Sequence, residues 1–219
     1  MISLEDYIVK KYRYLTLEQT ISEAIDILIE ENLTHIPIIE NDIFLGNLSL
    51  NDAETFESEQ SIEIASALFE PFFARETNSW FEILELFSKN QTNVIPILDT
   101  KNKIKGYYLF DDVITFFNET PFLKETGTTI IVEKDIYSYS ISQISQIFES
   151  NNSKIFGIFI SEVNDNIAQI TVKSTSININ EIIQSLRRYE YKIISEHLED
   201  QFLSDLKDRS DYLDKYLNI

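Results

Sequence analysis

Apolar residues recur at helical spacing in two separate stretches of the chain. Each stretch opens with a hydroxyl residue that is followed three positions later by a glutamate, Thr20 with Glu23 and Ser79 with Glu82. This is the spacing of a capping box, in which the hydroxyl and the carboxylate satisfy backbone amides at a helix start. The pattern therefore predicts two amphipathic helices, whose apolar positions are Ile21, Ala24, Ile25 and Leu28 in the first and Trp80, Ile83, Leu84 and Phe87 in the second.

Each predicted helix is followed by a short strand-like run that contains a proline. The runs are HIPII at residues 35–39 and VIPIL at residues 94–98. Proline lacks a backbone donor, so the start of a strand is where it does least harm. A polar turn and a second strand near Gly46 or Gly106 come next, and Asp52 or Asp112 stands where another helix should start. Each stretch thus predicts the order helix, strand, turn, strand, helix.

The two stretches are copies of one pattern. At an offset of 59 residues, Ile36-Pro37-Ile38 falls on Ile95-Pro96-Ile97. One inserted residue shifts the offset to 60, and then Gly46 falls on Gly106 and Asp52 falls on Asp112. Such a repeat predicts two modules of a single small fold. We expect the two modules to face one another about an approximate dyad.

This pair of copies resembles a tandem of CBS domains, which are β-α-β-β-α modules that associate as pseudo-twofold pairs. The signature of that family is a proline-containing strand, then a glycine, then Thr or Ser, two further residues, and Asp. The first copy matches it with Pro37, Gly46, Ser49 and Asp52, and the second with Pro96, Gly106 and Asp112. Leu109 stands in place of the hydroxyl residue in the second copy.

The resemblance implies an adenosine ligand, such as AMP or ATP, in a cleft between the modules. In that family the Asp contacts ribose hydroxyls, the Ser or Thr contacts phosphate or ribose, and the main chain near the proline strand reads adenine. Carried over to this chain, the implied ligand contacts are Ser49 and Asp52 in the first module, Thr34, His35 and Ile36 as main chain near the base, and Asp112 as the ribose contact of the second module.

Three residues depart from the pattern of nucleotide-binding members of that family, and Ser49 and Asp52 also have a purely structural interpretation. Leu109 removes a polar contact from the second cleft, whereas Asn51 and Asp111 occupy positions where many nucleotide binders carry a basic residue. Ser or Asp at a helix start is also a routine N-cap. Ser49 and Asp52 are therefore interpreted either as ligand contacts or as capping residues alone, and both interpretations stay open here.

The second half of the chain carries a different pattern. TTIIVEK (128–134) predicts a strand, residues 139–152 a helix, IFGIFISEV (155–163) and IAQITVKS (167–174) a hairpin, residues 177–191 a helix, and KIISEHL (192–198) a last strand. The order β-α-β-β-α-β is that of a ferredoxin-like unit. It resembles an ACT domain, although KDIYSYS (134–140) lacks the glycine-containing turn of ACT ligand sites. We expect no amino-acid ligand there.

The predicted fold class is therefore α+β, in four parts. CBS module 1 spans residues 1–60, CBS module 2 spans 61–120, an ACT-like domain spans 121–199, and an amphipathic C-terminal helix spans 200–219. Both CBS pairs and ACT domains tend to self-associate, so the resemblance implies a homodimer. The combination resembles acetoin-utilisation-type CBS–ACT regulatory proteins.

Composition narrows the function classes. The formal net charge is −19, of which residues 1–120 contribute −14 from 22 acidic and 8 basic residues. Such a surface repels phosphate backbones, so we expect no nucleic-acid partner. The chain has no cysteine and two histidines, which leaves no thiolate nucleophile and no ordinary zinc set, so we expect no metal and no catalysis. Without a long apolar run or a signal peptide, we expect a cytoplasmic protein with no membrane partner.

Two functions remain. The first is a non-catalytic sensor that binds an adenosine compound between the CBS modules and transmits the change to the ACT-like domain or to a regulated partner protein. The second is a degenerate CBS–ACT scaffold that acts in dimerisation or protein interaction without a nucleotide. Leu109, Asn51 and Asp111 favour the scaffold, whereas Ser49 and Asp52 favour the sensor.

Overall fold

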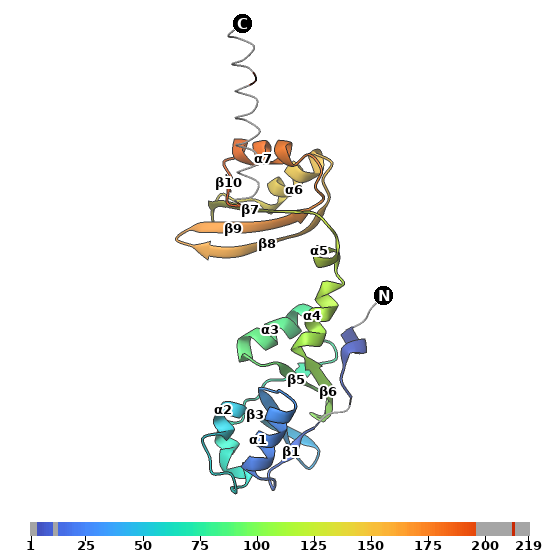
Figure 1. The fold of residues 1–219 in the computed structure, drawn as a ribbon, viewed down its shortest axis with the longest axis vertical. Helices are drawn as coiled ribbons and strands as arrows, with labels where there is room; N and C mark the ends of the chain where they lie inside the picture. Colours follow the sequence, from blue (N-terminus) through green and yellow to red (C-terminus); the bar gives the residue numbers. More distant parts are fainter. Residues whose placement is uncertain (1–3, 11–12, 196–211, 213–219) are drawn as a thin grey trace. The chain divides into compact units, whose positions relative to one another are not determined.

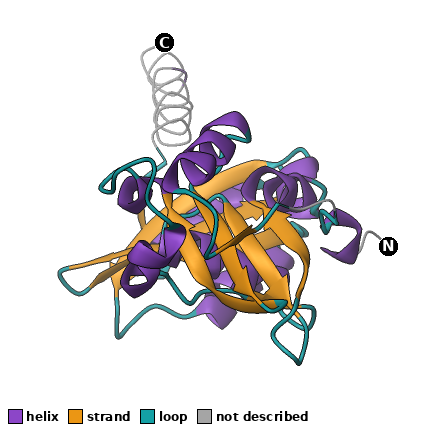
Figure 2. Cartoon of the chain, turned by 90° about the horizontal axis from the view of Figure 1, so that it is seen from below, coloured by secondary structure: helices purple, strands orange, loops and turns teal. Residues whose placement is uncertain are grey.

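The computed structural model of the chain describes residues 4–10, 13–195 and 212. It divides into two compact units, residues 1–119 and residues 120–219, and combines helices with strands in each (Figures 1 and 2). The first unit holds two three-stranded sheets and the second holds one four-stranded sheet. None of the described helices is long and apolar enough to cross a membrane.

The two copies of the repeat fold alike, as β-α-β-β-α modules. The first copy contains β1 (Leu15–Thr16), α1 (Ile21–Glu30), β2 (His35–Glu40), β3 (Ile43–Ser49) and α2 (Leu50–Ala53). The second contains β4 (Ala74–Arg75), α3 (Trp80–Asn90), β5 (Val94–Leu98), β6 (Ile104–Leu109) and α4 (Phe110–Asn118). In each sheet the proline strand lies in the middle, parallel to the first strand and antiparallel to the third. The repeat in the sequence is therefore a repeat in the fold.

Both predicted capping boxes are confirmed. The Glu23 amide donates to Thr20 Oγ1 at 3.2 Å, and the Thr20 amide donates to the Glu23 carboxylate at 2.8 Å. Ser79 and Glu82 make the same reciprocal pair at the start of α3, at 3.4 and 2.6 Å. The predicted apolar faces of α1 and α3 supply buried side chains to the two cores: Ile21, Ala24 and Leu28 from α1, and Ile83 and Phe87 from α3.

The segment that precedes each copy packs on the other copy. A 3₁₀ helix, η2 (Ile62–Leu68), contributes Ile62 and Ala65 to the core of the first copy, whereas Leu4 of η1 (Leu4–Tyr7) and Ile8 pack against the core of the second. The predicted division at residue 60 thus follows the sequence repeat, but side chains on each side of it pack in the core on the other side. This exchange of segments ties the two modules into one unit.

The repeated glycines give these exchanged segments room. A Cβ atom on Gly46 would lie 2.8 Å from Phe69 Cβ, and one on Gly106 would lie 2.5 Å from Ile8 Cγ2. The next residue in each strand, Asn47 or Tyr107, pairs through backbone hydrogen bonds with the incoming segment. Glycine recurs at this position because a second backbone approaches there.

The second unit has the predicted β-α-β-β-α-β order after a short helix, α5 (Pro121–Lys124). Its elements are β7 (Thr128–Asp135), α6 (Ile141–Ser150), β8 (Ile155–Asn164), β9 (Ile167–Ser174), α7 (Ile179–Arg188) and β10 (Lys192–Ile193). The strand order is β10-β7-β9-β8, and every neighbouring pair is antiparallel. Helices α6 and α7 cover one face of this sheet (Figure 1) and share a core with β7 and β9. Of the predicted last strand over 192–198, β10 comprises Lys192–Ile193, residues 194–195 are not strand, and residues 196–198 lie outside the described residues. The predicted helix over 200–219 also lies outside the described residues, Tyr212 excepted.

Candidate functional site

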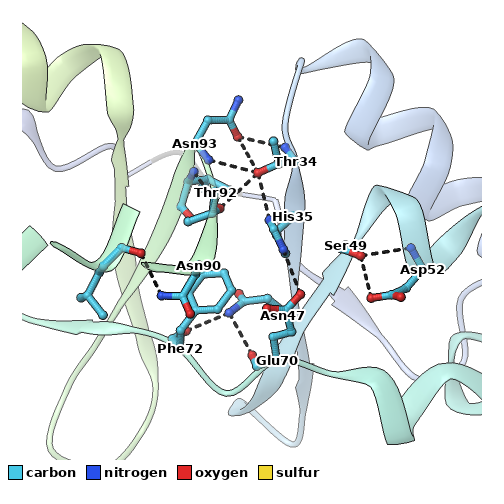
Figure 3. Close-up of polar contacts among 12 residues, drawn as sticks. Thr34, His35, Asn47, Ser49, Asp52, Glu70, Phe72, Asn90, Thr92 and Asn93 are labelled. Carbon is cyan, nitrogen blue, oxygen red and sulfur yellow. Dashed lines mark hydrogen bonds and ion pairs between the residues drawn. The ribbon is translucent and has the colours of Figure 1, made fainter. Parts of the chain in front are cut away.

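The site lies where the two copies meet. Thr34 and Asn93 occupy equivalent positions of the repeat, each just before its proline strand, and they bond to one another (Figure 3). The Thr34 amide donates to Asn93 Oδ1 at 2.9 Å, and the Asn93 amide donates to Thr34 Oγ1 at 3.0 Å. The Thr34 hydroxyl also donates to Asn93 Oδ1 at 3.0 Å, and Asn93 Nδ2 donates to the Asn32 carbonyl at 2.7 Å. The approximate dyad of the repeat therefore passes close to a pair of reciprocal hydrogen bonds.

His35 continues this network toward the segment between the copies. Its Nδ1 lies 2.9 Å from Thr34 Oγ1 and its Nε2 lies 3.1 Å from a Glu70 carboxylate oxygen. His35 is 6% exposed, and its ring meets Phe72 edge to face at 5.2 Å between centroids. Both ring nitrogens thus have protein partners, which gives His35 a bridging role in the structure.

Asn47 fixes the segment that carries Glu70. It is buried on β3, and its Nδ2 donates to the carbonyls of Glu70 and Phe72 at 3.1 and 2.8 Å. The backbone of Asn47 pairs with Glu70 in both directions, at 2.8 and 2.9 Å. These four bonds hold the Glu70 carboxylate beside His35.

Ser49 and Asp52 form a compact pair at the start of α2. The Asp52 amide donates to Ser49 Oγ at 3.0 Å, and the Ser49 hydroxyl donates to Asp52 Oδ2 at 2.7 Å. Ser49 is therefore an N-cap, and its hydroxyl hydrogen is already donated to Asp52. The second carboxylate oxygen of Asp52, Oδ1, has no hydrogen bond to any of the described residues. That oxygen can accept a hydrogen bond from a ligand.

A cleft of about 490 Å³ joins these groups. Its volume lies within the range of small-molecule sites, about 300–1,000 Å³. Four of the six predicted ligand residues line it, namely Thr34, His35, Ser49 and Asp52. The remaining lining comprises Asn32, Leu33, Leu50, Asn51, Glu70, Asn90, Gln91 and Asn93. The lining thus comes from both copies and from the segment that joins them.

The other two predicted residues lie elsewhere. Ile36 is fully buried in the core of the first copy, because it faces inward on the middle strand of the sheet. Asp112 lies in the first turn of α4 and does not line this cleft. Leu109 precedes α4 without a side-chain cap, and the following Phe110 packs against Phe87 with ring centroids 5.4 Å apart. The second copy therefore presents an apolar surface where the first presents Ser49 and Leu50.

The charge of the cleft is negative. Among the described residues that line it, Asp52 and Glu70 are acidic and none is lysine or arginine. Its other polar groups are neutral amides and hydroxyls, together with the bridging His35. Within the described part of the chain, no group of three His, Cys, Asp or Glu side chains is arranged to hold a metal ion. The cleft therefore offers a ligand mainly hydrogen bonds from neutral amides and hydroxyls, and its two carboxylates can accept hydrogen bonds.

Sequence reasoning missed several lining residues. Asn93 could have been found, because the offset of 59 places it on Thr34 and residues near a dyad meet their own equivalents. Asn32 and Gln91, also 59 apart, both follow their helices with positive φ, at 53° and 47°. Glu70 had no comparable signal, since its position depends on the exchange of segments between the copies.

Comparisons with known proteins find one family that matches the first part of the chain. Residues 4–56 match the family described as the CBS domain. A search of curated proteins finds no match to the chain.

Solved structures with similar folds have low sequence identity. The chain is similar to a CBS domain pair/ACT domain protein from Thermotoga maritima, with 17% identity and a TM-score of 0.48 over 54% of this chain and 98% of the other. It is similar to the CBS domains of a transcriptional regulator from Streptococcus pneumoniae, with 13% identity and a TM-score of 0.46 over 52% and 98%. A third structure, CBSX2 in complex with AMP, has 15% identity and a TM-score of 0.43 over 52% and 95%. Similarity at this level says nothing about what this chain binds.

Proposed function

We propose that the first unit acts as a CBS domain pair, and that the chain is a non-catalytic regulatory protein that binds an adenosine-containing ligand, such as an adenine nucleotide, in the cleft between the two copies. The observation that carries the proposal is the cleft of about 490 Å³ around Asp52, whose Oδ1 is unpaired among the described residues. Ribose presents two hydroxyl donors, which a carboxylate oxygen accepts well. Ser49 then acts mainly by holding Asp52 in position, since its own hydroxyl donates to Oδ2.

The network around Thr34 gives the ligand a way to act on the protein. Thr34 and Asn93 line the cleft and also make the hydrogen bonds that join the copies. A ligand that favours one relative arrangement of the copies shifts the population toward that arrangement. We expect this change in arrangement to be transmitted to the second unit or to a regulated partner protein.

A thermal-shift series with AMP, ATP, S-adenosylmethionine and adenosine tests the proposal on the full chain. We expect at least one of them to raise the melting temperature of the first unit, since a ligand that binds only the folded state stabilises it. Asp52→Ala should remove the response. Asp112→Ala is the matched control, because it makes the same change at the equivalent position of the other copy, outside the cleft lining.

The alternative function is a scaffold without a nucleotide. The reciprocal bonds between Ser49 and Asp52 favour it, because capping of α2 already accounts for both side chains. In that case none of the four compounds changes the melting temperature. The melting temperatures of Asp52→Ala and Asp112→Ala then differ only because the two substitutions affect the stability of α2 and α4 differently.

The second unit is proposed to be an ACT-like, ferredoxin-like domain, and the chain is proposed to form a homodimer. The support for the domain is the strand order β10-β7-β9-β8 with two helices in the connections. Sedimentation of the full chain at several concentrations tests the dimer. A monomer across the micromolar range would contradict it.

A further inference from the structure

The ligand cleft contains two carboxylates and no lysine or arginine among the described residues that line it, and this charge bears on the ligand class. Asp52 comes from the first turn of α2, and Glu70 comes from the segment between the copies, so they approach the cleft from different elements. His35 lies 3.1 Å from Glu70, and it is the one lining group that can carry a positive charge in this part of the chain. Even with His35 protonated, the lining has a net charge of −1.

We infer that this cleft selects an adenosine compound without phosphate groups, neutral or positively charged at the 5′ position, and that it discriminates against AMP and ATP. The inference rests on the proposed function and narrows its ligand class. The phosphate of AMP carries a charge of about −1.5 to −2 at pH 7. Asp52 and Glu70 both line this one cleft of about 490 Å³, and charges closer than one Debye length, about 10 Å at 0.1 M salt, are screened only in part. Phosphate would therefore meet repulsion that salt screens only in part.

The neutral groups of the cleft suit the rest of such a ligand. Asn32, Asn51 and Gln91 are exposed at its rim, and their carboxamides can donate to and accept from adenine and ribose edges. Asp52 Oδ1 can accept from a ribose hydroxyl. None of these contacts requires a charged ligand. The helix α2 has only four residues, so its start offers little attraction to a phosphate.

A series of three ligands that differ only at the 5′ position tests the inference. We expect calorimetry on the full chain to give the tightest binding for 5′-amino-5′-deoxyadenosine, weaker binding for adenosine, and binding of AMP about ten-fold weaker than that of adenosine at 0.1 M salt. Raising the salt concentration should narrow the gap between adenosine and AMP, since added ions screen the carboxylates.

Two charge variants distinguish the effect of charges in the cleft on ligand binding from the effect of the net charge of the whole protein. Glu70→Gln keeps an oxygen that can accept from His35 and removes one negative charge from the lining, so it should narrow the gap between adenosine and AMP about three-fold. Glu85→Gln makes the same change in net charge at an exposed position of α3 that does not line the cleft, and it should leave the gap unchanged.

The outcomes distinguish this inference from the proposed function. Binding of AMP as tight as that of adenosine, or an equal effect of Glu70→Gln and Glu85→Gln, would overturn the inference and leave the ligand cleft in place. Failure of all three compounds to bind, with no thermal-shift response to ATP or S-adenosylmethionine either, would overturn the proposed function itself. Adenosine tighter than AMP, with a gap that Glu70→Gln alone narrows, would support both.

Discussion

Replacing Asn93 with alanine removes three side-chain hydrogen bonds that join the two copies near their dyad, whereas the bond from its backbone amide to Thr34 Oγ1 remains. The side chain accepts from the Thr34 amide and hydroxyl at 2.9 and 3.0 Å, and donates to the Asn32 carbonyl at 2.7 Å. A typical hydrogen bond contributes about 0.5–1.5 kcal/mol net, and a buried donor left without a partner costs about 1–3 kcal/mol. Because these groups are partly buried, we expect Asn93→Ala to lower the free energy of unfolding of the first unit by about 2–3 kcal/mol.

Urea unfolding followed by tryptophan fluorescence measures this loss in the first unit alone. The chain has one tryptophan, Trp80 at the start of α3, and it packs against Phe81, Phe116 and Phe117. With a urea slope of about 2 kcal/mol per molar, the middle of the usual range, the midpoint should fall by about 1–1.5 M.

The matched control for this change is Asn90→Ala. Asn90 also lines the cleft, but its one hydrogen bond, to the Leu86 carbonyl at 2.8 Å, stays within α3. We expect a loss of about 1 kcal/mol or less there. A midpoint for Asn93→Ala no lower than that for Asn90→Ala would refute the claim that these bonds hold the copies together.

Three further changes test other parts of the structure. Ser49→Ala should lower the stability of the first unit by about 1 kcal/mol in the same urea assay, because α2 loses its N-cap, whereas Ser49→Thr should retain most of it. Gly106→Ala should lower stability by about 1–3 kcal/mol, since the added Cβ meets Ile8 at 2.5 Å; a variant as stable as the parent would contradict the close approach. Burial raises the pKa of the Tyr191 phenol, while its hydrogen bond to Ser140 opposes the shift. A raised pKa in the folded state contributes stability below about pH 10 that is lost at higher pH, so circular dichroism should show alkaline destabilisation of the second unit that is smaller in Tyr191→Phe.

Local signals predicted the first unit well. The capping boxes at Thr20 and Ser79 fixed the starts of α1 and α3, because that chemistry is complete within four residues. The offset of 59 related the two copies, and the dyad it implies explains why Thr34 meets Asn93. In the second unit, the same kind of pattern predicted the order of all six main elements.

The remaining features depend on contacts between distant segments. No pattern within residues 61–70 indicates that η2 joins the core of the first copy, or that Asn47 brings Glu70 to the cleft. The negative charge of the cleft follows from that placement. Ile36 was predicted as a main-chain contact, and that role stays a prediction; its side chain enters the core of the first copy.

The difference between the copies leads to a last prediction, on stoichiometry. A symmetric pair would offer two equivalent clefts, but the second copy has Leu109 where the first has Ser49, and α4 starts without a side-chain cap. Phe110 stands where the first copy has Leu50, and it packs edge to face on Phe87. In the first copy the Ser49 hydroxyl donates to the Asp52 carboxylate, and Leu109 cannot make the equivalent bond to Asp112. We therefore expect calorimetry with adenosine to give one ligand per chain, unchanged by Asp112→Ala and lost in Asp52→Ala. Two equivalent sites per chain would show that the serine at this position is dispensable, and the argument that Ser49 positions Asp52 would then be wrong.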